Sequence, residues 1–132
     1  MANRNTIRVV AAEIERDGRF LITQRRPSAI LPLLWEFPSG RVEPGETDEA
    51  ALIRELEERL NVQVSVQQLS MFIKHEYDDY LLDFCVYRCA LLTEAIESKR
   101  VHDWKWVTPL EMDGHEFPPA DAQTIQKLLE SR

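Results

Sequence analysis

Between Gly40 and Val62 the chain reads GRVEPGETDEAALIRELEERLNV, a glycine-containing turn that leads into an amphipathic segment. Thr47 is a typical helix-capping residue, and the two acidic residues that follow it suit the positive end of a helix dipole. One face of the helix would carry apolar residues at helical spacing, namely Ile53, Leu56 and Leu60. The pattern predicts a helix after Thr47, and Asn61 can adopt the left-handed conformation that ends it.

The polar side of the same helix carries carboxylates next to arginine. Glu55 and Glu58 are three residues apart, which places their Cβ atoms about 5–6 Å from each other on adjacent turns. Two such carboxylates could bind one hard cation, Mg²⁺ or Mn²⁺, and Glu46 precedes the helix closely enough to reach the same region. Arg54 can hold Glu55 by a planar guanidinium contact. The stretch therefore predicts a divalent metal site on this helix.

Length and charge limit the class of protein. The chain has 132 residues and a formal charge of −7, from 16 Lys and Arg against 23 Asp and Glu. This length predicts a single domain over residues 1–132. The acidic balance argues against duplex nucleic acid as a partner, but it is compatible with a small nucleotide. Apolar runs are too short to span a membrane and no secretory signal is visible, so we expect no membrane association and a cytoplasmic location.

Strands are expected on both sides of the helix. Residues 9–16 and 19–25 flank Asp17-Gly18, a pair that favours a tight hairpin turn. Residues 26–45 contain four of the seven prolines and two of the four glycines, which predicts a long loop. Further strands are expected over 62–66, 70–77, 80–91 and 104–107, followed by a helical turn at 108–112 and a last helix after 117–121. This order predicts an α/β fold, a mixed sheet with helices on its faces.

The stretch that opens this section resembles the Nudix box, G-x5-E-x7-R-E-U-x-E-E-x-G-U, where U is apolar. Seven of the nine defined positions match, namely Gly40, Glu46, Arg54, Glu55, Leu56, Glu58 and Val62. Segments 35–40, 106–109 and 117–121 are similar to segments of MutT-type members, so the resemblance covers nearly the whole chain. It implies the Nudix fold, a three-layer α/β/α sandwich with a mixed central sheet (α/β or α+β).

The resemblance also implies an activity, the Mg²⁺- or Mn²⁺-dependent cleavage of a nucleoside triphosphate or a related nucleoside diphosphate derivative. In MutT-like members the products are a nucleoside monophosphate and pyrophosphate, and the base is often oxidised or modified. By position, the metal would be held by Gly40, Glu46, Glu55 and Glu58. The catalytic residues would be Arg54, Glu55 and Glu58. By position, the substrate would be contacted by Arg25, Phe37 and Asp121. Arg59 and Arg100, which depart from the family pattern, are further candidates for contact with the substrate. A monomer and a homodimer are both compatible with the sequence.

Asp121 has two interpretations at this level. The family match makes it the residue that reads the base, accepting from an exocyclic amine such as cytosine N4 or donating if burial keeps it protonated. Its place at the start of the last helix equally suits a partner for the helix dipole.

Two positions depart from the family pattern by a reversal of charge. Arg59 stands at the second glutamate of the E-E pair, and Arg100 stands where MutT-like members carry another glutamate. Arginine stays protonated, so it can neither bind a cation nor act as a base. Arg59 is also four residues from Glu55, where an ion pair could neutralise a remaining ligand. A second hypothesis follows: a non-hydrolytic Nudix-fold domain that binds a nucleotide or a partner protein, with both arginines contacting phosphates directly.

Overall fold

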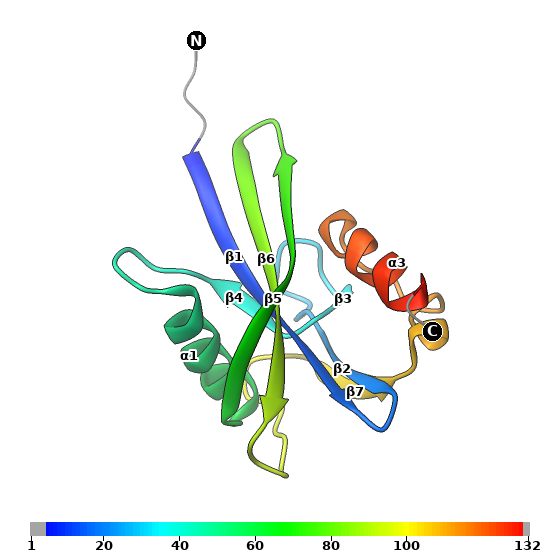
Figure 1. Ribbon diagram of the computed structural model, residues 1–132. Coiled ribbons are helices and arrows are strands. Elements are labelled where there is room, and N and C mark those ends of the chain that lie inside the picture. The colour runs from blue at the N-terminus through cyan, green and yellow to red at the C-terminus, as the bar shows by residue number, and fades with distance from the viewer. Residues whose placement is uncertain (1–4, 131–132) are drawn as a thin grey trace.

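A computed structural model describes residues 5–130, and these residues form a mixed sheet with helices on both faces (Figure 1). The elements in chain order are β1 (Asn5–Arg16), β2 (Arg19–Gln24), β3 (Trp35–Glu36), β4 (Ser39–Arg41), α1 (Asp48–Leu60), β5 (Val64–Glu76), β6 (Tyr80–Leu91), β7 (Asp103–Val107), α2 (Pro109–Met112), the 3-10 turn η1 (Pro119–Asp121) and α3 (Ala122–Glu130). The expected single domain, residues 1–132, extends beyond the described residues at both ends.

Strand β1 organises the sheet because it pairs with three neighbours. β6 runs parallel to it, from Asn5 opposite Tyr80 to Ile14 opposite Cys89. β2 and β4 pair antiparallel with different parts of β1. β5 continues the sheet beyond β6, and β3 and β7 both pair with β2. The β1–β2 hairpin turns at Asp17 and Gly18, whose φ angles of 53° and 79° confirm the expected tight turn.

Alternate residues of β1 face two different cores, as the two-residue period of a strand requires. One core contains residues of β1 and α1, among them Val10, Ala12, Ile14, Leu52, Leu56 and Leu60. The other contains Ala11 with residues of α2 and α3, among them Met112 and Leu128. Figure 1 shows α1 and α3 on opposite sides of the sheet. The three-layer arrangement expected from the resemblance is therefore confirmed.

Helix α1 begins and ends where its capping residues predict. The Thr47 side chain accepts a hydrogen bond from the Ala50 N–H at 3.1 Å, and Asn61 has φ 54° and ψ 43°. Asn61 thus takes the left-handed conformation that the family pattern assigns to glycine. Asp48, in the first turn, accepts two hydrogen bonds of 2.8 Å from Arg8 of β1. This contact joins the start of the helix to the sheet and positions its polar face next to β4.

Two expectations about strands are corrected. Residues 26–45 contain the short strands β3 and β4 in addition to loop. Residues 62–66 and 70–77, expected as separate strands, belong largely to the single strand β5. Its pairing with β6 shifts register between Val66 and Met71, and such an irregularity disturbs the alternation by which a strand is recognised. The two polar residues Gln67 and Gln68 lie at this irregularity, and in the sequence they resemble a break between two strands.

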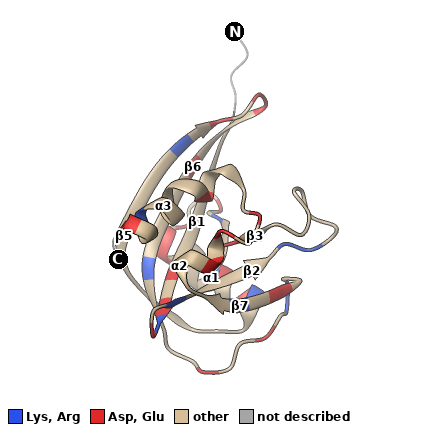
Figure 2. Cartoon of the chain, turned by 90° about the vertical axis from the view of Figure 1, so that its right-hand side faces the viewer, with Lys and Arg blue, Asp and Glu red and all other residues tan. Residues whose placement is uncertain are grey.

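Charged residues are distributed over the whole fold. Figure 2 shows acidic and basic segments interspersed along helices, strands and loops. Within residues 5–130, no helix combines the length and the apolar character that crossing a membrane requires. The polar face of α1 and the loop between β2 and β3 both carry charged residues.

Candidate functional site

The polar face of α1 forms a network of ion pairs around Arg54. The guanidinium of Arg54 donates to both oxygens of Glu46, at 2.7 and 2.9 Å, and this contact lowers the Glu46 pKa to about 2. It also donates to Glu55 Oε1 at 2.8 Å and to Glu58 Oε2 at 3.4 Å. A further bond to the Arg41 carbonyl, 3.0 Å long, connects the helix to β4. The structure therefore brings the three expected carboxylates together through one arginine.

The two arginines that replace family glutamates contact the same carboxylates. Arg59 Nε donates to Glu55 Oε2 at 2.7 Å, which confirms the ion pair expected from their spacing. Arg100 Nη1 lies 3.9 Å from Glu58 Oε2. Both oxygens of Glu55 are thus occupied, one by Arg54 and one by Arg59. Among the residues that the structure describes, no three Asp, Glu, His or Cys side chains are arranged to hold a metal ion.

Gly40 lies against Glu55, which is 8% exposed. A Cβ built on Gly40 would overlap the Glu55 side chain, so only glycine leaves room for that carboxylate at this point of β4. The oxygens of Glu55 and Glu58 and the Gly40 carbonyl are hard donors of the kind that Mg²⁺ and Mn²⁺ prefer. The residues present therefore fit a divalent ion in their chemistry, with Arg59 competing for one of the donor atoms.

Two adjoining cavities lie beside this network. The first has a volume of about 350 Å³, and the charged residues that line it are Arg25, Arg26, Arg59, Arg100, Glu36, Glu55 and Glu58. The second, of about 250 Å³, has an aromatic and acidic lining that includes Tyr77, Tyr80, Phe84 and Asp121. Three residues line both cavities, namely Arg25, Glu36 and Arg59. The cavities therefore meet at these residues.

Arg25 and Glu36 form an ion pair at this junction. Arg25 Nη1 donates to Glu36 Oε1 at 3.0 Å, and its Nε donates to the Ile30 carbonyl at 2.7 Å. Burial raises the pKa of Glu36, and the nearby Arg25 opposes that rise. The sequence prediction included Arg25 but missed Glu36. The pairing of β3 with β2, which sets Glu36 opposite Thr23, places it beside Arg25.

The expectation that Phe37 contacts the substrate is corrected. Phe37 is 0% exposed, and its ring centroid lies 6.0 Å from that of Phe117 in the core. Successive residues of an extended chain point to opposite sides, and Glu36 takes the side facing the cavities. The aromatic lining comes instead from Tyr77 and Tyr80, whose rings stack with centroids 4.7 Å apart. In the sequence analysis, these tyrosines were only the end residues of two expected strands, 70–77 and 80–91.

Asp121 lines the second cavity and is almost completely buried. It is 3% exposed, and its Oδ1 has no hydrogen-bond partner among the described residues. Burial raises its pKa well above the usual range, Glu36 adds to the rise, and Arg25 opposes it. Asp121 ends η1 directly before α3, so it keeps the place at a helix start that suits a partner for the helix dipole. Its unpartnered oxygen, in the lining of the cavity, is also available to a ligand.

Asp121→Asn should flatten the pH dependence of stability. Because the folded pKa is raised, the protonated carboxyl stabilises the fold below the ordinary value of 3.8, and this contribution is lost as pH rises through the folded pKa. One such group gives a slope of at most about 1.4 kcal/mol per pH unit. Urea denaturation between pH 4 and 8 measures it. Asp113→Asn, an exposed control, should retain the wild-type slope, and an equal slope in Asp121→Asn would contradict the prediction.

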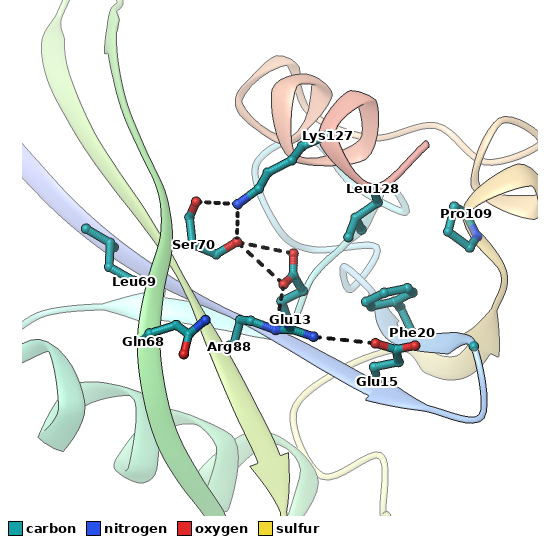
Figure 3. Close-up of a pocket in the computed structure, with 11 residues that line it drawn as sticks. Glu13, Glu15, Phe20, Gln68, Leu69, Ser70, Arg88, Pro109, Lys127 and Leu128 are labelled. Carbon is teal, nitrogen blue, oxygen red and sulfur yellow. Dashed lines mark hydrogen bonds and ion pairs between the residues drawn. The ribbon is translucent and has the colours of Figure 1, made fainter. Parts of the chain in front are cut away.

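A third cavity, of about 410 Å³, lies elsewhere, between β1, β5, β6 and α3 (Figure 3). Glu13 lies in it, with the Ser70 hydroxyl 3.5 Å from each carboxylate oxygen and Arg88 Nε 3.6 Å away. Lys127 Nζ donates to the Ser70 carbonyl at 2.6 Å. These polar groups contact one another, and none of the residues expected in the site lines this cavity. The two cavities beside α1 are therefore the candidate functional site.

Known proteins of similar sequence and structure match most of this chain. The family model for the NUDIX domain matches residues 9–127. A "CTP pyrophosphohydrolase" of Escherichia coli is 30% identical over 126 residues, 96% of this chain and 93% of that protein. An "8-oxo-dGTP diphosphatase" of Haemophilus influenzae is 33% identical over 131 residues, 96% and 94% of the two chains. The solution structure of a MutT protein from methicillin-resistant Staphylococcus aureus is 33% identical with a TM-score of 0.79, and the match covers 98% of this chain and 100% of that one.

Proposed function

Because the chain belongs to the Nudix family, we propose that it is a MutT-like pyrophosphohydrolase that cleaves a nucleoside triphosphate to the monophosphate and pyrophosphate. The observation that carries this proposal is the pair of adjoining cavities. One has tyrosine rings and a buried acid, and the other has four arginines beside the glutamates of α1. A nucleoside triphosphate has the same two parts, a flat base and an anionic phosphate chain.

The base occupies the cavity of Tyr77, Tyr80 and Asp121 in this proposal. Bases stack on aromatic side chains with about 1–3 kcal/mol each. Burial raises the pKa of Asp121 and so favours its protonated form, in which the carboxyl can donate to an acceptor atom of the base as well as accept. The similar proteins are named for CTP and for 8-oxo-dGTP, so an aminopyrimidine and an oxidised purine are the two candidate bases.

The phosphate chain lies in the arginine-lined cavity, where guanidinium groups can form paired hydrogen bonds to phosphate oxygens. Glu55, Glu58 and the Gly40 carbonyl would hold Mg²⁺ or Mn²⁺, which supplies polarisation of the phosphoryl group when bound. Arg54 orients Glu55 through its bond to Oε1. Glu46, expected as a further ligand, acts on the site through its two bonds to Arg54.

A second candidate function is nucleotide binding without hydrolysis. The observation in its favour is that Arg59 contacts Glu55 at 2.7 Å and Arg100 lies 3.9 Å from Glu58, so the carboxylates already have positive partners. In this function the arginines contact phosphate directly and no metal is required.

Pyrophosphate release tests the two functions. We would measure it with CTP, 5-substituted pyrimidine triphosphates, 8-oxo-dGTP and the ordinary triphosphates, each with Mg²⁺ and with Mn²⁺. The hydrolase proposal expects turnover of at least one substrate that Glu55→Gln does not turn over. Absence of such turnover would overturn it. Nucleotide binding that persists in EDTA and is lost in Arg59→Glu would then establish the second function.

A further inference from the structure

Arg59 occupies the point where the two cavities meet, and it holds an oxygen that a metal ion would use. Its Nε lies 2.7 Å from Glu55 Oε2, and the two side chains are 34% and 11% exposed. Both residues lie on α1, one turn apart, so the pair forms within a single rigid element. The contact therefore exists in the free chain without help from a ligand.

The charges around Glu55 nearly balance without a metal ion. The negative groups are Glu43, Glu46, Glu55 and Glu58, and the positive groups are Arg54, Arg59 and Arg100. A divalent cation entering this network meets an excess of only one negative charge. The Arg54 guanidinium donates to four groups, namely Glu46, Glu55, Glu58 and the Arg41 carbonyl. The Arg59 guanidinium donates to Glu55 and otherwise acts on Glu36 only through its charge, among the described residues. Arg59 is therefore the arginine that can leave Glu55 most easily.

A phosphate chain offers Arg59 a new partner. Arg59 lines the arginine-rich cavity of about 350 Å³, and its partly exposed side chain faces the space that the phosphates would enter. Phosphate oxygens accept paired hydrogen bonds from a guanidinium group and carry more charge than one carboxylate. Transfer of Arg59 to phosphate would release Glu55 Oε2 as a donor atom.

We propose that Arg59 is an exchangeable counterion of Glu55. It neutralises Glu55 in the free chain and transfers to the phosphate chain of the bound nucleotide, so that the divalent ion binds together with the nucleotide and not before it. This inference rests on the proposed function, because it concerns the order of binding at the same site.

If Arg59 exchanges between Glu55 and phosphate, one substitution of Arg59 should change the affinity for a metal ion and the affinity for phosphate in opposite directions. Arg59→Gln removes the competitor for Glu55, and the affinity for Mn²⁺ without nucleotide should rise about tenfold. The same change removes a phosphate contact, and the affinity for inorganic tripolyphosphate in EDTA should fall about tenfold. A purely structural role of Arg59 would not move the two affinities in opposite directions.

The experiment measures Mn²⁺ binding by electron paramagnetic resonance and tripolyphosphate binding by calorimetry. The matched control is Arg19→Gln on β2, where an exposed arginine lies 3.4 Å from Glu111 and lines neither cavity of the site. Both affinities should remain at the wild-type value in this control. Neither measurement involves turnover, so the two proposals can fail separately. If both affinities shift as expected but the protein hydrolyses no nucleotide, the counterion exchange stands and only the hydrolase proposal is rejected.

Unchanged affinities in Arg59→Gln, or changes of the same sign, would overturn the inference. Arg100→Gln provides a second variant in case Arg59→Gln does not fold, because the Arg100 side chain is 64% exposed. Arg100 lies 3.9 Å from Glu58, and its loss should shift both affinities about threefold in the same two directions. Wild-type affinities for both ligands in a folded Arg100→Gln protein would also overturn the inference.

Discussion

Glu55→Gln should lower the rate of pyrophosphate release by roughly 10²–10⁴-fold, the effect usual for loss of a group that acts directly in catalysis. Glutamine has nearly the same shape as glutamate, but it lacks the charge that binds a cation and that holds Arg54 and Arg59 at 2.8 and 2.7 Å. Both arginines are partly exposed, so the loss of stability should be only about 1 kcal/mol. The variant should therefore fold and fail in turnover.

Initial rates at saturating Mg²⁺, together with urea denaturation, check this prediction. Glu57→Gln is the matched control, because Glu57 lies on the same helix but is exposed, and its carboxylate accepts a hydrogen bond from Gln63 at 3.0 Å, away from the site. We expect its rate to remain within about twofold of wild type, as for a surface substitution. A Glu55→Gln protein that kept more than a tenth of the wild-type rate would exclude Glu55 from the catalytic set.

Gly40→Ala should damage both stability and activity. The added Cβ would occupy the position of the Glu55 carboxylate, so either β4 or the Glu55 side chain must move. Overpacking of this kind costs about 1–3 kcal/mol. If Glu55 moves, it leaves both the Gly40 carbonyl and Arg54, and turnover should fall nearly as far as in Glu55→Gln. A combined loss is expected because the same contact positions the helix and the carboxylate.

Urea denaturation and pyrophosphate release measure the two losses in Gly40→Ala. The control is Gly114→Ala, where the nearest atom to a new Cβ would be the Glu111 carbonyl oxygen at 3.6 Å, an ordinary contact. This control should change stability by no more than about 0.5 kcal/mol. Wild-type stability and turnover in Gly40→Ala would show that Glu55 has room that the structure does not indicate.

Much of the fold could be predicted because its signals are local. The cap at Thr47, the apolar stripe of α1 and the left-handed Asn61 all depend on residues within a few positions of one another. The same is true of the Asp17-Gly18 turn. The irregular strand β5 was not predicted, because its continuity depends on pairing with β6 across a register shift.

The site was predicted less completely than the fold. Arg59 contacts Glu55 as their four-residue spacing on the helix suggests, and the long side chain of Arg54 reaches Glu55 from the adjacent position. Phe37 was assigned to the wrong side of its chain segment, and Glu36, Tyr77 and Tyr80 were missed. Each of these depends on which strand its segment pairs with, and a local pattern carries no information about that pairing.

The amino-acid sequence alone determined the family, the helix that carries the carboxylates and the two reversals of charge on it, because a motif and a helical period are properties of neighbouring residues. Only the tertiary structure decided that Gly40 lies against Glu55, that Arg100 approaches Glu58, and that two cavities meet at Arg25, Glu36 and Arg59. These contacts join residues far apart in the chain. They exist only after β1 has paired with β4 and β6 and α1 has packed on that sheet.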